Sequence, residues 1–462
     1  MKWLRILGVL LALMLSKDVQ AQTATVTWAN THQTIDGFGG SVVGDYIALP
    51  TNLADFFFSP NSGIGLSILR VQVIPDSSTC VTYCSTRGCK CVASTGATIL
   101  TGELLTIQQA QARGVTTFIA SSWSPPASMK SNASWLSGGT FLGGASNYSS
   151  LASTFTSYLT LLKANGVTLY GFSPQNEPNV NVGYQSALWT AQQFHDFIPV
   201  LSASFGEAGF GNTRIIFPEY GQWSSTYGGF AATAMNDGAV SPLVGIMAGH
   251  GYGGDNNIVA PTTYGKHVWM TEDSDQSPTY DGSMTDAMIW AKRIHNYLAV
   301  ANVNAYVWWT LSDMPSLGEG TDNSALTDFN GNIPKRAYVT GNWSKFVRPG
   351  WVRIDANANP QTGVDVTAFK ETATGNFAIV VVNENGNNVE QNISLSGFNS
   401  GSVTPWVTSA SLSLAPQSNV SLANGAFSYS LSPDSVTTFV GVAGSGTASR
   451  PNAPSGLVAV VH

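Results

Sequence analysis

Two glutamates each follow a run of β-forming apolar residues. Glu177 ends the stretch "TLYGFSPQNEP" (168–178), and Glu272 lies near the end of "HVWMTEDSD" (267–275). Two carboxyl groups held about 5–5.5 Å apart can cleave a glycosidic bond with retention, one as acid/base and the other as nucleophile. Alternatively, each glutamate simply caps the helix that follows it. The choice depends on whether the fold brings the two strand ends together.

Between residues 36 and 345, short apolar runs alternate with longer amphipathic stretches. Segments 150–166 and 283–302 have the apolar spacing of helices. This alternation predicts a (β/α)₈ barrel, an α/β TIM barrel fold. The rival is a doubly wound open sheet, but "GFGG" (37–40) lacks the G-x-G-x-x-G spacing of its phosphate loop. The eight expected strands lie at 37–44, 66–75, 116–126, 168–178, 213–223, 243–253, 267–275 and 305–314.

The carboxyl ends of barrel strands meet at one mouth, where functional groups gather. Glu177 ends the fourth expected strand and Glu272 the seventh, so both are expected at that mouth. Glu219 ends the fifth in "FPEYGQW" and is either a third acidic group in the cleft or a cap.

The chain changes character on both sides of the barrel. Residues 346–442 alternate apolar and polar side chains with Gly and Asn at turns, which predicts an antiparallel β-sandwich side domain. The N-terminal strand in 22–35 is expected to join this domain. Residues 443–462 have the composition of a linker, and "LVAVVH" resembles the first strand of a further module.

The first 21 residues have the pattern of a secretory signal peptide, with Lys2 and Arg5 before the apolar run Ile6 to Leu15. We therefore expect a secreted, extracellular protein that does not span a membrane. Only 10% of residues are charged and the net charge is −7, which argues against nucleic acid or an anionic membrane as partner.

Four cysteines, Cys80, Cys84, Cys89 and Cys91, lie in "CVTYCSTRGCKC". In an exported protein such a cluster favours two disulfides over a zinc site. Cys89 and Cys91 are too close to pair comfortably, so each is expected to join Cys80 or Cys84.

Seven stretches in order resemble glycoside hydrolase family 30, most closely its bacterial endo-β-1,4-xylanase and glucuronoxylanase branch. They span the expected barrel from first strand to last, and the family's β side domain matches residues 346–442. The stretches are "QTIDGFGGS" (33–41), "LRVQV" (69–73), "SSWSPPASMK" (121–130), "SPQNEP" (173–178), "HGYG" (250–253), "WMTE" (269–272) and "YVWW" (306–309).

The resemblance implies that Glu177 is the general acid/base and Glu272 the nucleophile of a double displacement. Arg70 would keep Glu272 ionised, or would form a structural ion pair. Asn176 would bond the sugar 2-hydroxyl, or would be a turn residue. His250 and Tyr252 would orient Glu272 and line the sugar site, or would be structural.

Aromatic side chains at strand ends offer faces on which sugar rings stack. Trp123 and one of the pair Trp308 and Trp309 are expected to contact substrate. Because strand side chains alternate, the other member of the pair must point into the barrel wall.

The resemblance implies hydrolysis of β-1,4-xylosidic bonds in xylan-type hemicellulose by a monomer without a cofactor. Xylanases of this family that need glucuronate hold it with an arginine after strand eight, whereas residues 306–334 contain no Lys or Arg. Strict glucuronate dependence is therefore not expected. The alternatives are β-1,6-galactanase, β-1,6-glucanase or β-glucosidase specificity on the same site, and a non-catalytic carbohydrate-binding barrel. A metal site is not expected, since only His250, Asp273 and Asp275 could contribute ligands.

Overall fold

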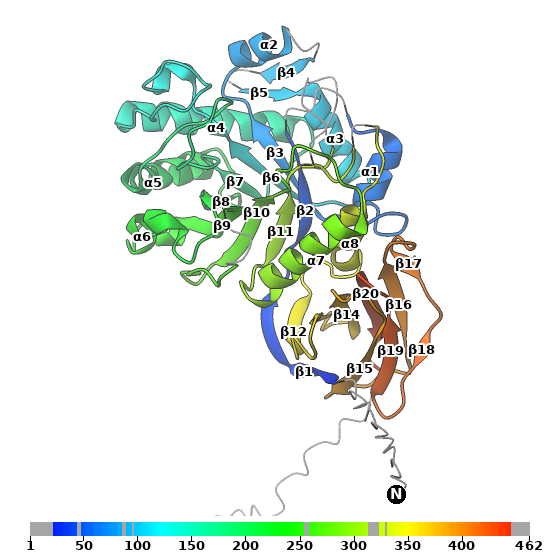
Figure 1. The fold of residues 1–462 in the computed structure, drawn as a ribbon. Coiled ribbons are helices and arrows are strands. Elements are labelled where there is room, and N and C mark those ends of the chain that lie inside the picture. The colour runs from blue at the N-terminus through cyan, green and yellow to red at the C-terminus, as the bar shows by residue number, and fades with distance from the viewer. Residues whose placement is uncertain are drawn as a thin grey trace, which may run out of the picture.

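The computed structural model describes residues 22–43, 48–85, 89–94, 97–253, 258–312, 323–328 and 330–444. The predicted signal peptide (1–21), and nearly all of the predicted linker and module start (443–462), lie outside these ranges. Figure 1 shows a barrel wrapped by helices above a smaller β-rich domain.

The barrel is a closed sheet of eight parallel strands, so the predicted TIM barrel is confirmed. Going round the sheet, the strands follow the order β10-β11-β2-β3-β6-β7-β8-β9. The strand expected at 168–178 is shorter than predicted, because it leaves the sheet after Ser173. The strands are β2 (Gly37–Val42), β3 (Ile68–Val73), β6 (Thr117–Ser122), β7 (Gly171–Ser173), β8 (Arg214–Gln222), β9 (Val244–Tyr252), β10 (His267–Asp273) and β11 (Ala305–Trp308).

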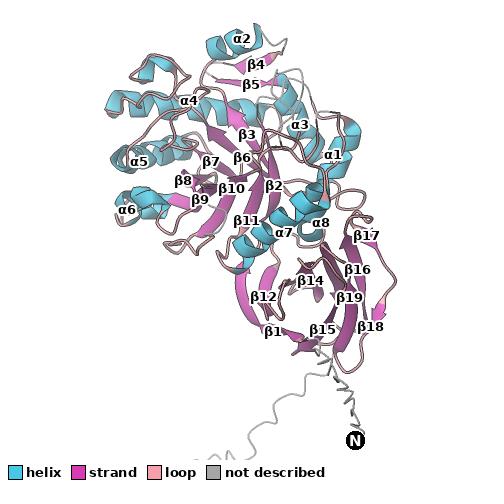
Figure 2. Ribbon diagram, in the orientation of Figure 1, coloured by secondary structure: helices cyan, strands magenta, loops and turns pink. Residues whose placement is uncertain are grey.

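Helices surround this barrel on its outer face (Figure 2). The longest starts at Ala145 and the next at Ala191, where Thr190 and Gln193 form a capping box. The α-helices are α1 (Thr51–Phe58), α2 (Ser77–Ser85), α3 (Thr101–Gln111), α4 (Ala145–Ala164), α5 (Ala191–Glu207), α6 (Phe230–Met235), α7 (Met284–Ala299) and α8 (Lys335–Ser344). Short 3₁₀ turns lie at Ala127–Met129, Tyr227–Gly229 and Ser241–Leu243.

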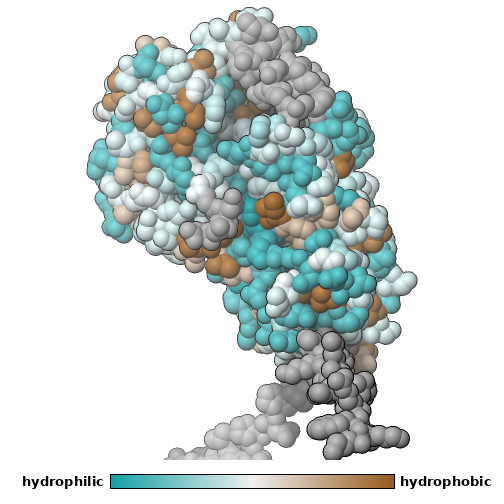
Figure 3. All heavy atoms as spheres, viewed as in Figure 1, coloured by the Kyte–Doolittle hydropathy of each residue, from teal (hydrophilic) through white to brown (hydrophobic). Residues whose placement is uncertain are grey.

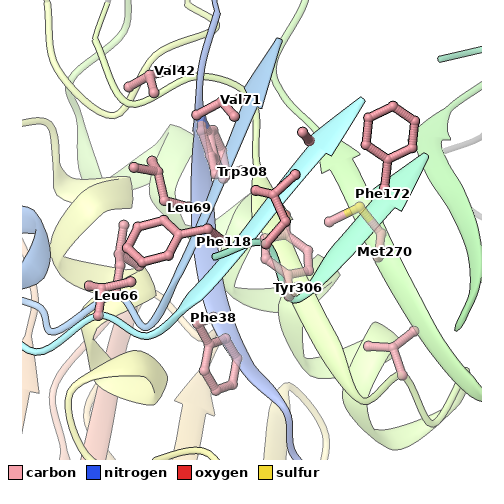
Figure 4. Packing of buried hydrophobic residues seen from close by; sticks show 14 of the residues in the cluster. Phe38, Val42, Leu66, Leu69, Val71, Phe118, Phe172, Met270, Tyr306 and Trp308 are labelled. Atoms are coloured by element: carbon pink, nitrogen blue, oxygen red, sulfur yellow. The ribbon is translucent and has the colours of Figure 1, made fainter. Parts of the chain in front are cut away.

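The strand side chains divide into two buried layers. One layer fills the barrel, where the rings of Tyr170 and Trp269 stack with centroids 5.7 Å apart. The other faces the helices, and Figure 4 shows Leu69, Val71 and Trp308 in it. The period-2 alternation between these layers decides which strand residues can reach the barrel mouth.

The side domain is a ten-stranded sheet in which β1 lies between β12 and β15. The N-terminal segment 23–34 is thus a strand of this domain. β1 pairs in parallel with β15 and antiparallel with β12, and the other pairs are antiparallel. The strands are β1 (Thr23–Thr34), β12 (Val352–Ala356), β13 (Val364–Lys370), β14 (Asn376–Asn383), β15 (Val389–Ser396), β16 (Ser402–Thr408), β17 (Ala415–Pro416), β18 (Val420–Ser421), β19 (Ala426–Leu431) and β20 (Ser435–Val442).

Helix α8 joins the two domains through buried polar and aromatic side chains. Asn342 donates to the Trp406 carbonyl at 3.1 Å and to Thr438 Oγ1 at 3.0 Å. The indole of Trp343 donates to Thr367 Oγ1 at 3.2 Å. The buried core of the barrel's outer face continues into the side domain at Phe369, Ala378 and Val436.

A small excursion after β3 carries α2 and the hairpin of β4 (Cys91–Ser94) and β5 (Ala97–Leu100). Disulfides join Cys80 to Cys91 and Cys84 to Cys89. The two predicted disulfides are confirmed, and each of Cys89 and Cys91 pairs with one of the earlier cysteines.

Only 10% of the residues are charged. On the face in Figure 3, hydrophobic residues lie in small groups among hydrophilic ones. Among the helices of the described ranges, none has the length and apolar character needed to cross a membrane.

Candidate active site

Strand β9 delivers two of the predicted residues to the barrel mouth by regular alternation. Ile246 and Ala248 fill the barrel interior, and His250 and Tyr252 continue the same face. His250 is completely buried.

Two other strands reach the mouth only because their register shifts. The pairing of β8 with β9 shifts between Pro218 and Tyr220, and that of β10 with β9 shifts between Met270 and Glu272. Such β-bulges re-aim a side chain. They bring Glu219 and Glu272 into the site, although strict alternation from the inward Ile216 and Trp269 would point both outward.

Glu177 lies in the loop between β7 and α5, with a left-handed φ of 46°. Its amide nitrogen donates to the Glu219 carbonyl at 3.1 Å, and its own carbonyl accepts from the Val180 amide at 3.0 Å. Glu219 is also left-handed, with φ of 51°. Non-glycine residues in this region cost about 1–3 kcal/mol each and cluster at functional sites.

Arg70 of β3 connects the acidic groups. Its guanidinium donates to Glu272 Oε2 at 2.5 Å and to Asn176 Oδ1 at 2.6 Å, and its Nη2 lies 3.3 Å from Glu219 Oε1. Its Nε donates to Ser121 Oγ at 3.2 Å. Arg70 is completely buried, so these contacts replace its hydration.

His250 lies among the three carboxylates. Its Nδ1 is 2.9 Å from Glu177 Oε1 and 3.8 Å from Glu272 Oε1, and its Nε2 is 3.9 Å from Glu219 Oε1. One side-chain oxygen of Glu177 and one of Glu272 lie within 4.8 Å of each other. An inverting glycosidase separates its carboxyl groups by about 6.5–9.5 Å, so the spacing here is of the retaining kind.

Tyr252 fixes the other oxygen of Glu272. Its hydroxyl donates to Glu272 Oε1 at 3.0 Å and lies 3.3 Å from Ser274 Oγ. Together with Arg70 on Oε2, this bond holds the Glu272 carboxylate at both oxygens. Such two-sided support gives a nucleophile a defined direction of attack.

The residue after Glu272 anchors this strand end from behind. Asp273 accepts from Arg293 of α7 at 2.9 and 3.1 Å, and Arg293 also donates to the Gly251 carbonyl at 2.8 Å. This buried ion pair ties α7 to both β9 and β10.

Burial and charge set the protonation of these groups. Burial lowers the pKa of His250, but the surrounding Glu272, Glu177 and Glu219 outweigh it and raise that pKa to about 10. Burial raises the pKa of Glu219, but the positive Arg70 and the His250 contacts bring it down to about 2. The pKa of Glu272 is raised by burial and by Glu177, against the lowering effect of His250 and Arg70. The site thus holds two cations and an ionised Glu219.

Glu177, His250 and Glu272 also have the spacing of a metal site. A metal would need neutral imidazole, whereas the three carboxylates favour the imidazolium form of His250. Arg70 already occupies Glu272. The charges of this cluster therefore favour a proton over a divalent cation.

The predicted tryptophans divide as strand alternation requires. Trp123 and the half-buried Trp309 lie with ring centroids 5.8 Å apart, and the Arg70 guanidinium lies 4.7 Å from the Trp123 ring centroid. Trp308 instead packs on Trp290 in the helix-facing layer, with ring centroids 4.4 Å apart. A substrate-binding role for Trp308 is therefore wrong, because its completely buried ring points away from the mouth.

One aromatic residue near the site is absent from the sequence predictions. Tyr184 follows Glu177 in the same loop and its side chain is 52% exposed, while its carbonyl accepts from the Ser137 amide at 2.9 Å. Burial and then the charges of Glu177 and Glu272 raise the pKa of its phenol. An aromatic residue seven positions after the acid was the available signal.

A TIM barrel whose mouth holds two carboxylates at this spacing, beside tryptophan rings, defines a glycoside hydrolase. Two family models match the chain: O-Glycosyl hydrolase family 30 over residues 21–239, and Glycosyl hydrolase family 30 beta sandwich domain over residues 350–439. The chain belongs to glycoside hydrolase family 30.

Curated and solved relatives agree with this assignment. Glucuronoxylanase XynC of Bacillus subtilis (strain 168) is 30% identical over 451 residues, which cover 94% of this chain and 95% of that protein. The structure of the subfamily 8 xylanase Xyn30A from Clostridium acetobutylicum has a TM-score of 0.77 and 31% identity, covering 91% of this chain and 99% of that one. The structure of the catalytic domain of xylanase C from Talaromyces cellulolyticus has a TM-score of 0.75 and 25% identity. The match covers 91% of this chain and 100% of that one. These relatives confirm the predicted xylanase branch of the family.

Proposed function

We propose that this protein is a secreted retaining endo-β-1,4-xylanase that works without a strict need for glucuronate side chains. The observation that carries the retaining mechanism is the approach of Glu177 and Glu272 to within 4.8 Å. The xylan specificity is supported by the relatives, two of which are named as xylanases at 31% and 25% identity.

In the first step, Glu272 attacks the anomeric carbon while Glu177 gives its proton to the leaving-group oxygen. The mechanism requires Glu177 to carry a proton and Glu272 to be ionised at this point, in which case the cations Arg70 and His250 balance the anions Glu219 and Glu272. Ester formation removes the charge of Glu272 and ionises Glu177, so the cluster stays balanced.

In the second step, Glu177 acts as base toward water, which attacks the anomeric carbon and releases Glu272. His250 supports this change of role, since its Nδ1 lies 2.9 Å from Glu177 Oε1 and donates to the carboxylate. The proton returns to Glu177 and the cycle closes.

Contacts around this pair suit a pyranose ring. Arg70 donates to Asn176 Oδ1, which turns the amide NH₂ of Asn176 the other way, toward a sugar 2-hydroxyl. The half-buried Trp309, beside the buried Trp123, offers a ring face for stacking. We also expect Tyr184 to contact the leaving-group sugar, because it shares the loop of the acid Glu177.

Loose glucuronate dependence is supported by the charge of the loops around the mouth. No Lys or Arg occurs in residues 253–265, 274–283 or 309–334, which follow β9, β10 and β11. A uronate placed there would lack the bidentate partner that an arginine supplies.

Product analysis by mass spectrometry tests this function, with glucuronoxylan, arabinoxylan, linear xylan and β-1,6-linked galactan and glucan as substrates. We expect comparable cleavage of linear and decorated xylan, and proton NMR should show the β-anomer as the first product. Products with one glucuronate at a fixed position would contradict the loose dependence. Activity on the β-1,6 glycans alone would contradict the xylan specificity and leave the mechanism intact.

A further inference from the structure

Glu219 is a buried acid that the two-step mechanism does not use. Its side chain is completely buried, so it does not reach solvent or a sugar at the mouth. Its place at a bulge of β8 and its left-handed φ of 51° show that the chain accepts strain to turn it inward.

Glu219 contacts both cations of the site. Its Oε1 lies 3.3 Å from Arg70 Nη2 and 3.9 Å from His250 Nε2. Arg70 Nη1 in turn lies 2.5 Å from Glu272 Oε2, and His250 Nδ1 lies 2.9 Å from Glu177 Oε1. Glu219 is therefore linked to both catalytic carboxylates through their cationic partners.

The backbone adds a second connection. The carbonyl of Glu219 accepts the amide of Glu177 at 3.1 Å, so the two left-handed residues are joined directly. A displacement of Glu219 would therefore also move the acid.

We propose that Glu219 is a positioning residue that balances the charges of Arg70 and His250, so that Glu177 keeps its proton in the free enzyme. This inference rests on the proposed function, in which Glu177 must begin each cycle protonated. The balance of charges supports this inference, because the two cations Arg70 and His250 need two anions, and Glu219 and Glu272 supply them.

Removing the charge of Glu219 leaves Glu272 as the remaining anion that faces Arg70 and His250. Ionised Glu177 then becomes the second counterion, so its proton is lost at lower pH. His250 stays protonated in the acidic range, because Glu272 and Glu177 still face it.

The Asp273–Arg293 ion pair behind Glu272 is charged but is the same in every variant, and the other polar groups around this cluster carry no charge in that range. Ser121 lies against Arg70, Ser173 bonds Glu219, and the phenol of Tyr252 has a raised pKa because of burial and Glu272. The expected change therefore comes from Glu219 itself.

The test is the pH dependence of kcat/KM on linear xylan for wild type, Glu219→Gln and Glu219→Asp. The basic limb of this profile reports the loss of the proton from the essential acid of the free enzyme. In Glu219→Gln we expect this limb to move to a lower pH by about one unit. At pH values above the limb, kcat/KM should then be about tenfold lower than in wild type. Glu219→Asp keeps the charge, and its limb should stay at the wild-type position.

A uniform loss of activity with an unmoved limb would overturn the proposal and leave Glu219 a structural residue. Should Glu219→Gln fail to fold, Glu219→Ala replaces it, and added formate should bring its limb back toward wild type. Glu177→Gln measured alongside separates the two hypotheses. If the loss of activity in Glu177→Gln does not depend on the leaving group, the assignment of Glu177 as the acid fails. If that loss does depend on the leaving group but the basic limb of Glu219→Gln has not moved, only the proposed role of Glu219 is refuted.

Discussion

The imidazole Nδ1 of His250 lies 2.9 Å from Oε1 of Glu177. Because three carboxylates raise the pKa of His250 to about 10, the ring donates this hydrogen bond as an imidazolium. Oε1 is then an acceptor in every step, so the catalytic proton of Glu177 must lie on Oε2. The contact thus orients the acid as well as stabilising its ionised form.

Glu177→Gln should slow hydrolysis of xylan by about 10²–10⁴-fold, the usual contribution of a general acid. An aryl xyloside with a strongly acidic leaving group needs no proton, so its glycosylation step should be slowed much less. Comparing kcat/KM across a series of aryl leaving groups measures the difference. Equal losses along the series would contradict the acid role.

Glu272→Gln should abolish turnover on every substrate, because an amide cannot form the glycosyl ester. The isosteric amide can still accept from Arg70 through its oxygen and donate to the Tyr252 oxygen through its NH₂, so the thermal midpoint should stay close to that of wild type. Glu207→Gln, the same change on an exposed residue at the end of α5, is the matched control and should keep full activity. Appreciable xylan hydrolysis by Glu272→Gln would refute the nucleophile assignment.

The adjacent tryptophans provide a matched pair of variants. Trp309→Ala should raise KM for xylan about tenfold, equivalent to about 1.4 kcal/mol, with little change in the thermal midpoint. Trp308→Ala should instead destabilise the fold by about 3–5 kcal/mol, since its ring is completely buried on Trp290. Urea unfolding and steady-state kinetics on both variants check the division, and the reverse pattern would contradict it.

The sequence was sufficient for the barrel and for placing Glu177 and Glu272 at strand ends, because both depend on repeated local patterns. Strand and helix periods recur eight times, and β9 keeps its alternation through His250 and Tyr252. The strand-end positions of Glu177 and Glu272 follow from that repetition.

The place of Glu219 and the inward turn of Glu272 could not be obtained in this way. Both depend on bulges, which are register shifts between neighbouring strands and leave no local pattern. Strict alternation from Ile216 would have turned Glu219 toward the helices. Likewise, alternation showed that one of Trp308 and Trp309 points outward, but the choice needed the register of β11.

Stability should depend on pH through His195, away from the active site. Its ring bridges Asp196 at 2.9 Å and Asp237 at 3.0 Å, joining α5 to the segment after α6. Hydrogen bonds to these carboxylates raise the pKa of His195 above its usual value of about 6.5 and lower the pKa of each aspartate.

Both ring nitrogens donate only in the imidazolium form, so this bridge is complete below the unfolded pKa of His195 and is lost as the pH rises through the folded one. We therefore expect wild type to unfold at a higher temperature than His195→Gln near pH 5.5, and this advantage to shrink toward pH 8.5. Thermal unfolding of both proteins across that range measures it. The difference between the two curves cancels the titration of the other histidines. A difference that stayed constant with pH would mean that the bridge does not titrate.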